Sequence, residues 1–363
     1  MILDSGQEII FARTSFKWSN LASRNAGVTV VVVGFSRLKK SGFKQLYSEV
    51  NGIVSESAVE NINPYLINAP NIFVSARDSQ MSKLPVMLSG DKMTDGGHLV
   101  LSYMERNQII SEFPFSEHFI GRLYGGQEII KGVLRFAFLI SDQQLEQAKQ
   151  IPMVSSRLIS VSKMRSDSSK ATTQLLSSTP HKFDESRYKP VRKVVVAQLS
   201  SETRSYYPCK IVDICDVAMA PSLVIYNDDP WLIGLLCSRL HTAWIATVCG
   251  KLETRYRYSN TLGWNTFPVP LLTEKNKADL THCAEEVLLA RESHFPKTIA
   301  DLYDPDDMPD NLREAHELND EVLERIYIGR RFKNDTERLE KLFELYTKMT
   351  EAEKKPAKSR KKA

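Results

Sequence analysis

Cysteine is scarce in this chain of 363 residues, and long apolar runs are missing. The five cysteines are scattered, and no two have Cys-x-x-Cys spacing, which argues against zinc and dithiol redox motifs. No segment approaches the roughly 18–20 consecutive apolar residues of a transmembrane helix. The first residues lack the basic and apolar regions of a signal peptide. We therefore expect reduced thiols, a cytoplasmic location and no membrane partner.

Motifs for binding phosphate and for transferring groups are also missing. The pairs Gly96-Gly97 and Gly125-Gly126 match neither Gly-x-Gly-x-x-Gly nor a loop ending in Gly-Lys-Ser/Thr. Ile62-Asn63-Pro64-Tyr65 is similar to the Asn-Pro-Pro-Tyr loop of adenine methyltransferases, but it lacks the second proline, and we interpret it as a turn. The sequence therefore offers no catalytic, cofactor-binding or metal-binding residue. Its histidines and carboxylates show no spacing that would support a stand-alone enzyme.

Charge is distributed unevenly along the chain. The formal net charge is +4, and residues 351–363 alone hold six Lys/Arg and two Glu. Residues 151–210 hold eleven Lys/Arg against four Asp/Glu, whereas residues 301–320 hold eight Asp/Glu and one Arg. The acidic segment lacks the ligand spacing of a calcium loop, so we interpret it as solvated. A basic segment in an otherwise neutral body predicts a localised anionic partner.

Hydroxyl and basic side chains are concentrated between residues 155 and 179, where twelve residues are Ser or Thr. Hydroxyls mixed with long cations suit contacts with DNA phosphates, which position a protein without reading sequence. A polar, mobile loop is the plainer interpretation, and the two are compatible. The candidate phosphate contacts are Arg157, Lys163, Arg165 and Lys170 in this segment, together with Arg204 and Lys251 elsewhere.

The segment 250–259 is the most informative part of the sequence. If it is extended, its side chains alternate between two faces. Glu253, Arg255 and Arg257 then share one face, and Thr254, Tyr256 and Tyr258 share the other. Glu can accept a hydrogen bond from cytosine and Arg can donate two to guanine, so this face can read a C·G pair. A solvated, charged face without any ligand is an equally good interpretation of the pattern alone.

Periodicity predicts strands in the first three quarters of the chain and helices in the last. The run of β-branched residues at 28–34 favours a strand buried on both faces, as in an α/β sheet. Residues 9–12 and 15–18 indicate a second strand and a turn. Apolar spacing predicts one helix over 231–248, with His241 as a satisfied core histidine. Three more helices follow residue 273, with Asp310 and Asp335 as expected N-caps.

Several of these segments together resemble one family, the MmeI-like (type IIL) fused restriction–modification enzymes. The segments that carry the resemblance are Ile10–Asn20 with Val28–Gly34, Thr94–Leu101, Gly126–Ile130, Leu199–Pro208, Gly250–Ser259, Trp264–Pro270 and Leu342–Tyr346. The resemblance spans nearly the whole chain. It implies adenine-N6 methylation of DNA by the complete enzymes, with S-adenosylmethionine as cofactor. It also implies that Glu253 and Arg255 help to read one C·G pair, with Arg257 taking part.

The resemblance implies an α+β fold in four parts. These are a remnant of a methyltransferase domain with residual α/β strands (1–44), a mixed α/β target recognition domain (45–272), a small helical domain (273–349) and a basic, disordered tail (350–363). The family's methyl-donor loop, Asn-Pro-Pro-Tyr motif and nuclease motif have no match in this sequence, so we expect no cofactor in this chain.

The sequence thus predicts a DNA target recognition module for double-stranded DNA. A separate methyltransferase or nuclease chain is expected as its catalytic partner. The alternative is an interaction or assembly subunit, or an inhibitor, that binds a methyltransferase without reading DNA itself.

Overall fold

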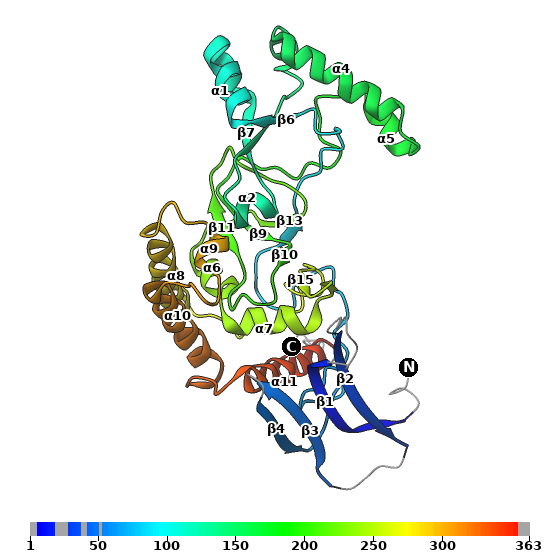
Figure 1. Cartoon of the computed structure of the whole chain (residues 1–363), viewed down its shortest axis with the longest axis vertical. Helices are drawn as coiled ribbons and strands as arrows, with labels where there is room; N and C mark the ends of the chain where they lie inside the picture. The colour runs from blue at the N-terminus through cyan, green and yellow to red at the C-terminus, as the bar shows by residue number, and fades with distance from the viewer. Residues whose placement is uncertain (1–5, 19–27, 38–41, 51–52, 355–363) are drawn as a thin grey trace, which may run out of the picture.

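The structure is a computed structural model that describes residues 6–18, 28–37, 42–50 and 53–354. In the view of Figure 1 the chain forms an open C. A small sheet near the N-terminus makes the lower end, a sheet flanked by helices makes the middle, and an upper lobe, formed by most of residues 93–183 together with Val217–Ala218, makes the other end. Strands and helices are mixed along the chain, which confirms the α+β class.

The lower sheet holds four strands in the order β2-β1-β3-β4. They are β1 (Glu8–Trp18), β2 (Val28–Ser36), β3 (Lys44–Val50) and β4 (Ile53–Val59). Strand β1 is antiparallel to β2 and parallel to β3. The sheet continues to Val59, so the domain boundary expected at residue 44 falls at the start of β3, inside this sheet.

The interpretation of residues 28–34 as a strand buried on both faces is wrong. Strand β2 lies at the edge of the sheet, and Val31 and Val32 are 50% and 44% exposed. The β-branched run does form a strand, but it has a neighbour on one side only among the described residues. Residues 9–12 and 15–18 belong to one long, bulged strand rather than to a strand and a turn.

The middle of the molecule is built on a four-stranded sheet. Its strands are β11 (Cys209–Val212), β9 (Lys193–Ala197), β13 (Ser222–Ile225) and β5 (Met87–Ser89), in that order. Helices α6 (Trp231–Leu236) and α7 (Arg239–Val248) pack against it through a large apolar core. The single helix expected over 231–248 is therefore wrong, because the Ser238 side chain accepts a hydrogen bond from the His241 amide and starts a new helix.

The upper lobe has its own sheet and core. Its strands are β12 (Val217–Ala218), β7 (Ile120–Tyr124), β8 (Arg135–Phe138) and β6 (Val100–Ser102). Its helical segments are α1 (Tyr103–Glu112), η2 (Pro114–Phe119), α3 (Leu145–Ala148), α4 (Pro152–Ser166), α5 (Ala171–Leu175) and η3 (Leu176–Ser178), whereas α2 (Gly126–Ile130) packs against β9 of the middle sheet. The polar loop expected at 155–179 is therefore wrong. Val154, Leu158 and Val161 recur at helical spacing and are buried in α4.

Arg165 holds the end of α4 to the rest of the upper lobe. Its side chain is fully buried and donates hydrogen bonds to five backbone carbonyls, at distances of 2.7–3.1 Å. These carbonyls belong to Met93, Thr94, Leu176, Thr179 and Lys182. The segment before β6 and the turns after α5 are thus joined through one guanidinium.

The C-terminal helices are α8 (Glu274–Glu292), α9 (Ile299–Leu302), α10 (Asp310–Ile328) and α11 (Asp335–Lys354). The three long helices were predicted, but their caps were not: Pro309 is the N-cap of α10, and Asn334 accepts a hydrogen bond from the Glu337 amide. Helix α11 also runs into the expected tail, as far as Lys354. The rest of that tail, residues 355–363, lies outside the described residues.

These helices share a large core with the middle sheet and its helices, and α8, α9 and α10 add a smaller apolar cluster that includes Val287, Leu302 and Leu312. Helix α8 packs against both α10 and α6, and α11 packs on α7 through Trp244 and Phe343, whose ring centroids are 5.2 Å apart. The Tyr327 hydroxyl donates to the Pro268 carbonyl at 2.9 Å. No helix in the described ranges is both long and apolar enough to cross a membrane.

A buried hydrogen bond joins α7 to the segment after β15 (Arg255–Arg257), which forms a small sheet with β10 (Leu199–Ser200) and β14 (Lys251–Leu252). His241 Nδ1 lies 2.9 Å from the Leu236 carbonyl, and its Nε2 lies 2.8 Å from the Tyr258 hydroxyl. Since a carbonyl only accepts, Nδ1 carries the proton and Nε2 accepts from Tyr258. Burial lowers the pKa of His241 to about 3, so the ring stays neutral at physiological pH. His241 is the core histidine that the sequence predicted.

We predict that Arg165→Met destabilises the upper lobe by about 3 kcal/mol, because several buried carbonyls lose their donor. Hydrogen exchange of α4 and chemical denaturation measure this. Lys163→Met, on the exposed side of the same helix, is the matched control and should change stability by less than about 0.5 kcal/mol. Equal effects of the two variants would contradict the role assigned to Arg165.

We also predict that the fold loses stability as pH falls below about 6.5, where unfolded histidine binds a proton that folded His241 does not. The contribution of His241 should reach about 2–3 kcal/mol by pH 4.5. Urea denaturation of His241→Gln at pH 7 and pH 4.5 should show a smaller loss than in the native protein. His118→Gln, an exposed histidine, should keep the native loss, and an identical loss in all three proteins would refute the assignment.

Candidate nucleic-acid interface

The charged ladder lies on a β-hairpin rather than on one extended strand. Lys251 pairs with Tyr256 and Leu252 with Arg255, so Glu253 and Thr254 form a two-residue turn. Glu253 has a φ of 58°, in the left-handed region that few residues other than Gly adopt. The expectation of simple alternation from Glu253 to Tyr258 is therefore corrected at the turn, because the chain reverses there.

Within β15 and the residue after it the predicted alternation holds. Arg255 and Arg257 are exposed, whereas Tyr256 is half-buried and Tyr258 is completely buried. The turn places Glu253 beside Arg255, and their carboxylate and guanidinium form an ion pair of 2.9 Å. The two side chains are 76% and 46% exposed. The hairpin tip therefore presents an acceptor and a forked donor side by side.

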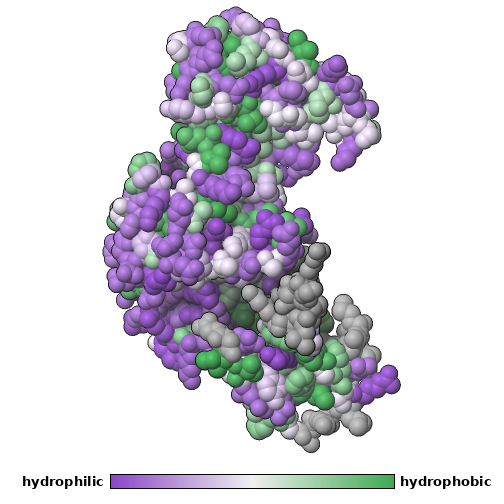
Figure 2. All heavy atoms as spheres, in the orientation of Figure 1, coloured by the Kyte–Doolittle hydropathy of each residue, from purple (hydrophilic) through white to green (hydrophobic). Residues whose placement is uncertain are grey.

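The base of the hairpin is fixed to the core. Strand β15 pairs with β10, and the Tyr258 amide donates to the Gln198 carbonyl at 2.8 Å. A Cβ on Gly263 would lie 2.4 Å from the Tyr258 ring, so only glycine leaves room for that ring. The hairpin stands on the inner side of the C, between the upper lobe and the lower sheet (Figure 1). Figure 2 shows hydrophilic residues around it.

A cavity of about 390 Å³ opens beside the hairpin. It lies between α2, the turn after β10 and Arg255. Lys131, Arg135, Arg204 and Arg255 line it, and Glu128 is the one acidic residue in its wall. Sequence inspection selected Arg204 and Arg255 but missed Lys131 and Arg135. Both residues closely follow the Gly126–Ile130 motif in the sequence, but only the folded chain brings them beside Arg255.

The structure separates the other candidate phosphate contacts into internal and exposed groups. Arg165 donates its hydrogen bonds to the backbone carbonyls described above. Arg157 donates to the His98 and Val100 carbonyls and forms an ion pair with Glu105. Because both guanidiniums already have acceptors inside the protein, we remove them from the candidate set. Lys163, Lys170 and Lys251 are exposed.

Arg204 differs from all of these. Its side chain is half-buried, and its Nε is buried without a hydrogen-bond partner in the described part of the chain. Burial lowers its pKa from the usual value for arginine. A half-buried guanidinium without an acceptor is costly, so an incoming anion would find donors already desolvated.

The segment that is similar to the methyltransferase loop forms a buried turn. Asn63, which stands where the methyltransferase loop would have its asparagine, is fully buried, and its Oδ1 accepts from the Tyr65 and Ile67 amides at 2.9 and 3.1 Å. Asn63 therefore closes its own turn, as predicted, and does not fit a role beside S-adenosylmethionine. No group of three or more potential metal ligands occurs within the described ranges.

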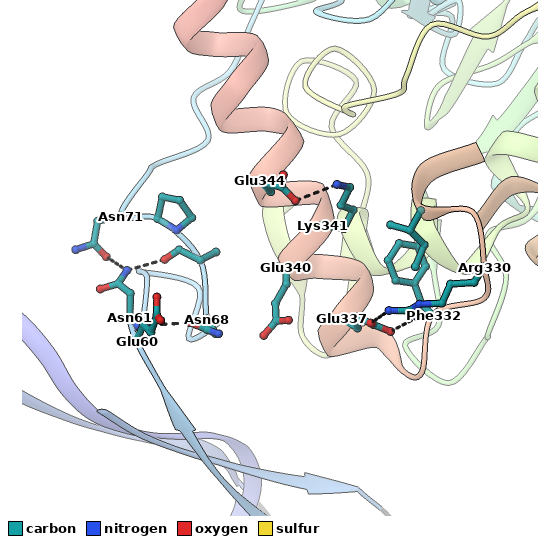
Figure 3. Close-up of a pocket in the computed structure, with 13 residues that line it drawn as sticks. Glu60, Asn61, Asn68, Asn71, Arg330, Phe332, Glu337, Glu340, Lys341 and Glu344 are labelled. Atoms are coloured by element: carbon teal, nitrogen blue, oxygen red, sulfur yellow. Dashed lines mark hydrogen bonds and ion pairs between the residues drawn. The ribbon is translucent and has the colours of Figure 1, made fainter. Parts of the chain in front are cut away.

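A second cavity, of about 800 Å³, lies between the turn at 60–71 and helix α11 (Figure 3). Two of its charged pairs are closed within the protein, Arg330 with Glu337 at 2.5 Å and Lys341 with Glu344 at 3.0 Å, and the other charged residues that line it, Glu60 and Glu340, are acidic. Neither cation in its wall is free to meet an anion such as DNA phosphate, and we assign no ligand to it.

Three family models match the chain in succession. Residues 68–271 match the MmeI target recognition domain, residues 272–352 match the MmeI C-terminal domain, and residues 1–48 match the MmeI DNA-methyltransferase domain. The resemblance found from motifs in the sequence is thereby confirmed.

Two known proteins are similar along nearly the whole chain. DNA methyltransferase A of Bacillus subtilis (strain 168) is 38% identical over 347 residues, which is 95% of this chain and 39% of that protein. The solved structure of the type IIL restriction-modification enzyme MmeI in complex with DNA aligns with a TM-score of 0.83 and 34% identity, over 96% of this chain and 47% of that one. The chain thus spans less than half the length of each relative. It belongs to the MmeI target recognition domain family.

Proposed function

We propose that this chain recognises a short sequence in double-stranded DNA for an adenine-N6 methyltransferase. The observation that carries the proposal is the exposed Glu253–Arg255 pair at the tip of a hairpin whose base is buried at Tyr258. The major groove of B-DNA, about 12 Å wide, admits a two-stranded β-ribbon. The solved relative is a complex with DNA, which supports DNA as the ligand.

In the proposed complex the two side chains at the tip divide the reading of one C·G pair. Arg255 donates to the O6 and N7 atoms of guanine, and Glu253 accepts from the N4 amino group of cytosine. Their ion pair holds both groups near each other before DNA arrives, which lowers the entropic cost of ordering them. In this proposal Arg257, which is exposed on the same strand, contacts a neighbouring base.

The remaining candidate cations, three exposed lysines and the half-buried Arg204, supply affinity rather than specificity. Lys163 and Lys170 in the upper lobe, and Lys251 and Arg204 near the hairpin, are the phosphate contacts that remain in the proposal. Contacts of this kind fix the register of a protein on the duplex and weaken as salt rises.

We further propose that the lower sheet binds a methyltransferase domain. The sequence predicts that this domain belongs to a separate chain. Strand β2 is an edge strand, and apolar side chains of this sheet are exposed, among them Trp18 at 53% and Ile53 at 73%. Figure 2 shows apolar residues gathered on the lower end of the molecule. An exposed, apolar edge strand is a template for another strand or sheet. S-adenosylmethionine would be bound by the docked domain.

We predict that exchanging the charges at the hairpin tip, Glu253→Lys with Arg255→Asp, changes one position of the bound sequence from C to G. Selection from random duplex DNA, followed by sequencing of the bound fraction, measures this. The wrong base at that position should cost about 1–3 kcal/mol in each protein. The matched control exchanges an exposed ion pair on α8, Glu274→Lys with Lys277→Asp, and should leave the selected sequence unchanged. The same selected sequence in all three proteins would remove Glu253 and Arg255 from the readout.

We also predict that the chain forms a stable complex with the portion of the Bacillus subtilis relative that it does not match. Replacing Val32 by Lys, on the exposed edge strand, should weaken the complex at least tenfold because a charge would be buried in an apolar interface. Analytical ultracentrifugation measures the affinity. The control is Leu318→Lys, at an exposed apolar position on α10. Equal affinity of both variants would contradict docking on β2.

A further inference from the structure

The cavity beside the hairpin has features that base reading alone does not explain. Four cations line it against a single carboxylate, and two of them lie outside the set that the sequence selected. Like charges around one small cavity repel each other in the free protein. An anion inside it would relieve this repulsion and be attracted by all four.

Arg135 is held in place by a buried acid. The Glu128 side chain is 1% exposed, and its two oxygens accept from different donors: Oε2 from the Gly125 amide at 2.8 Å and Oε1 from Arg135 Nε at 2.5 Å. The Nη1 and Nη2 atoms of Arg135 donate to no described residue. Because Nε is anchored, the free edge of the guanidinium is oriented before any ligand binds, which suits two parallel bonds to a phosphate.

Arg204 stands in the wall of the same cavity with unused donors. Its buried Nε lacks an acceptor, and it forms no ion pair within the described residues. Arg255 completes the group and is also the partner of Glu253 at the hairpin tip. The Arg255 side chain thus lines the cavity and also belongs to the hairpin tip that is proposed to read bases.

We propose that this cavity binds one phosphodiester group of the DNA strand, clamped by the guanidiniums of Arg135 and Arg204 with Lys131 beside them. Glu128 is a positioning residue for Arg135. The clamped phosphate holds the strand next to Arg255 and contributes affinity on any sequence, while the side chains of the hairpin discriminate between bases. This inference rests on the proposed function, because the ligand is part of the recognised duplex.

The test uses the full chain with one duplex that carries the selected sequence and one that does not, over a range of salt concentrations. Arg135→Gln and Arg204→Gln should each weaken binding about tenfold or more on both duplexes. Each should also reduce the slope of log affinity against log salt by about 0.9, as expected for the loss of one phosphate contact. The preference between the two duplexes should stay unchanged. Arg325→Gln, an exposed arginine on α10 paired with Glu321, is the matched control and should behave as the native protein.

Glu128→Gln separates positioning from net charge. The substitution makes the protein more positive, which by itself would tighten DNA binding. In Gln one of the two accepting oxygens becomes an NH2 group, which would face the Gly125 amide or Arg135 Nε with a second donor, so the clamp should loosen and binding should weaken several-fold. Thermal unfolding checks that each variant is folded at the assay temperature.

The outcomes distinguish the two proposals. Native affinity and native salt slope in Arg135→Gln and Arg204→Gln, with binding by the native chain intact, would overturn the clamp and leave DNA recognition standing. Tighter binding by Glu128→Gln would overturn the positioning role. Absence of DNA binding by the native chain would overturn the proposed function and the clamp together.

Discussion

The hydrogen bond from the Tyr258 hydroxyl to His241 Nε2 is the constraint on which the position of the hairpin depends. It is completely buried, and it ties the end of β15 to helix α7. Helix α7 in turn packs on α11, so the C-terminal helices stiffen the support beneath the hairpin. Side chains that read bases must be held in position to within a fraction of an ångström. Sites that are supported by packed helices and strands achieve this better than sites on free loops.

Burial decides which cations of this chain are structural and which are available. Arg165 and Arg157 donate hydrogen bonds to backbone carbonyls, and these bonds hold the upper lobe together. Arg135 and Arg204 keep donors unused beside a cavity that opens next to the hairpin. The same residue type in neighbouring stretches of sequence thus serves stability in one place and, if the phosphate clamp is correct, ligand binding in the other. The difference lies in whether folding supplies an acceptor.

The sequence predicted several features that depend on local periodicity, but it missed two local features, the turn at Glu253 and helix α4, as well as those that depend on distant parts of the chain. The alternation of Arg255, Tyr256, Arg257 and Tyr258 and the three long C-terminal helices were visible in the order of residues. The turn at Glu253 was missed because neither Gly nor Asn marks it. The helix α4 was missed because its many hydroxyls masked the stripe of Val154, Leu158 and Val161. The edge position of β2 and the cavity that joins Arg135 to Arg204 are set by tertiary packing, which no local pattern encodes.

The central claim is that Arg255 contacts a guanine in the major groove, and methylation interference at guanine N7 tests it most directly. In duplexes carrying the selected sequence, methylation of one guanine should block binding of the native chain. The same methylation should have no further effect on Arg255→Ala, because the contact it blocks is already gone. Interference at identical guanines with equal strength in both proteins would contradict the account.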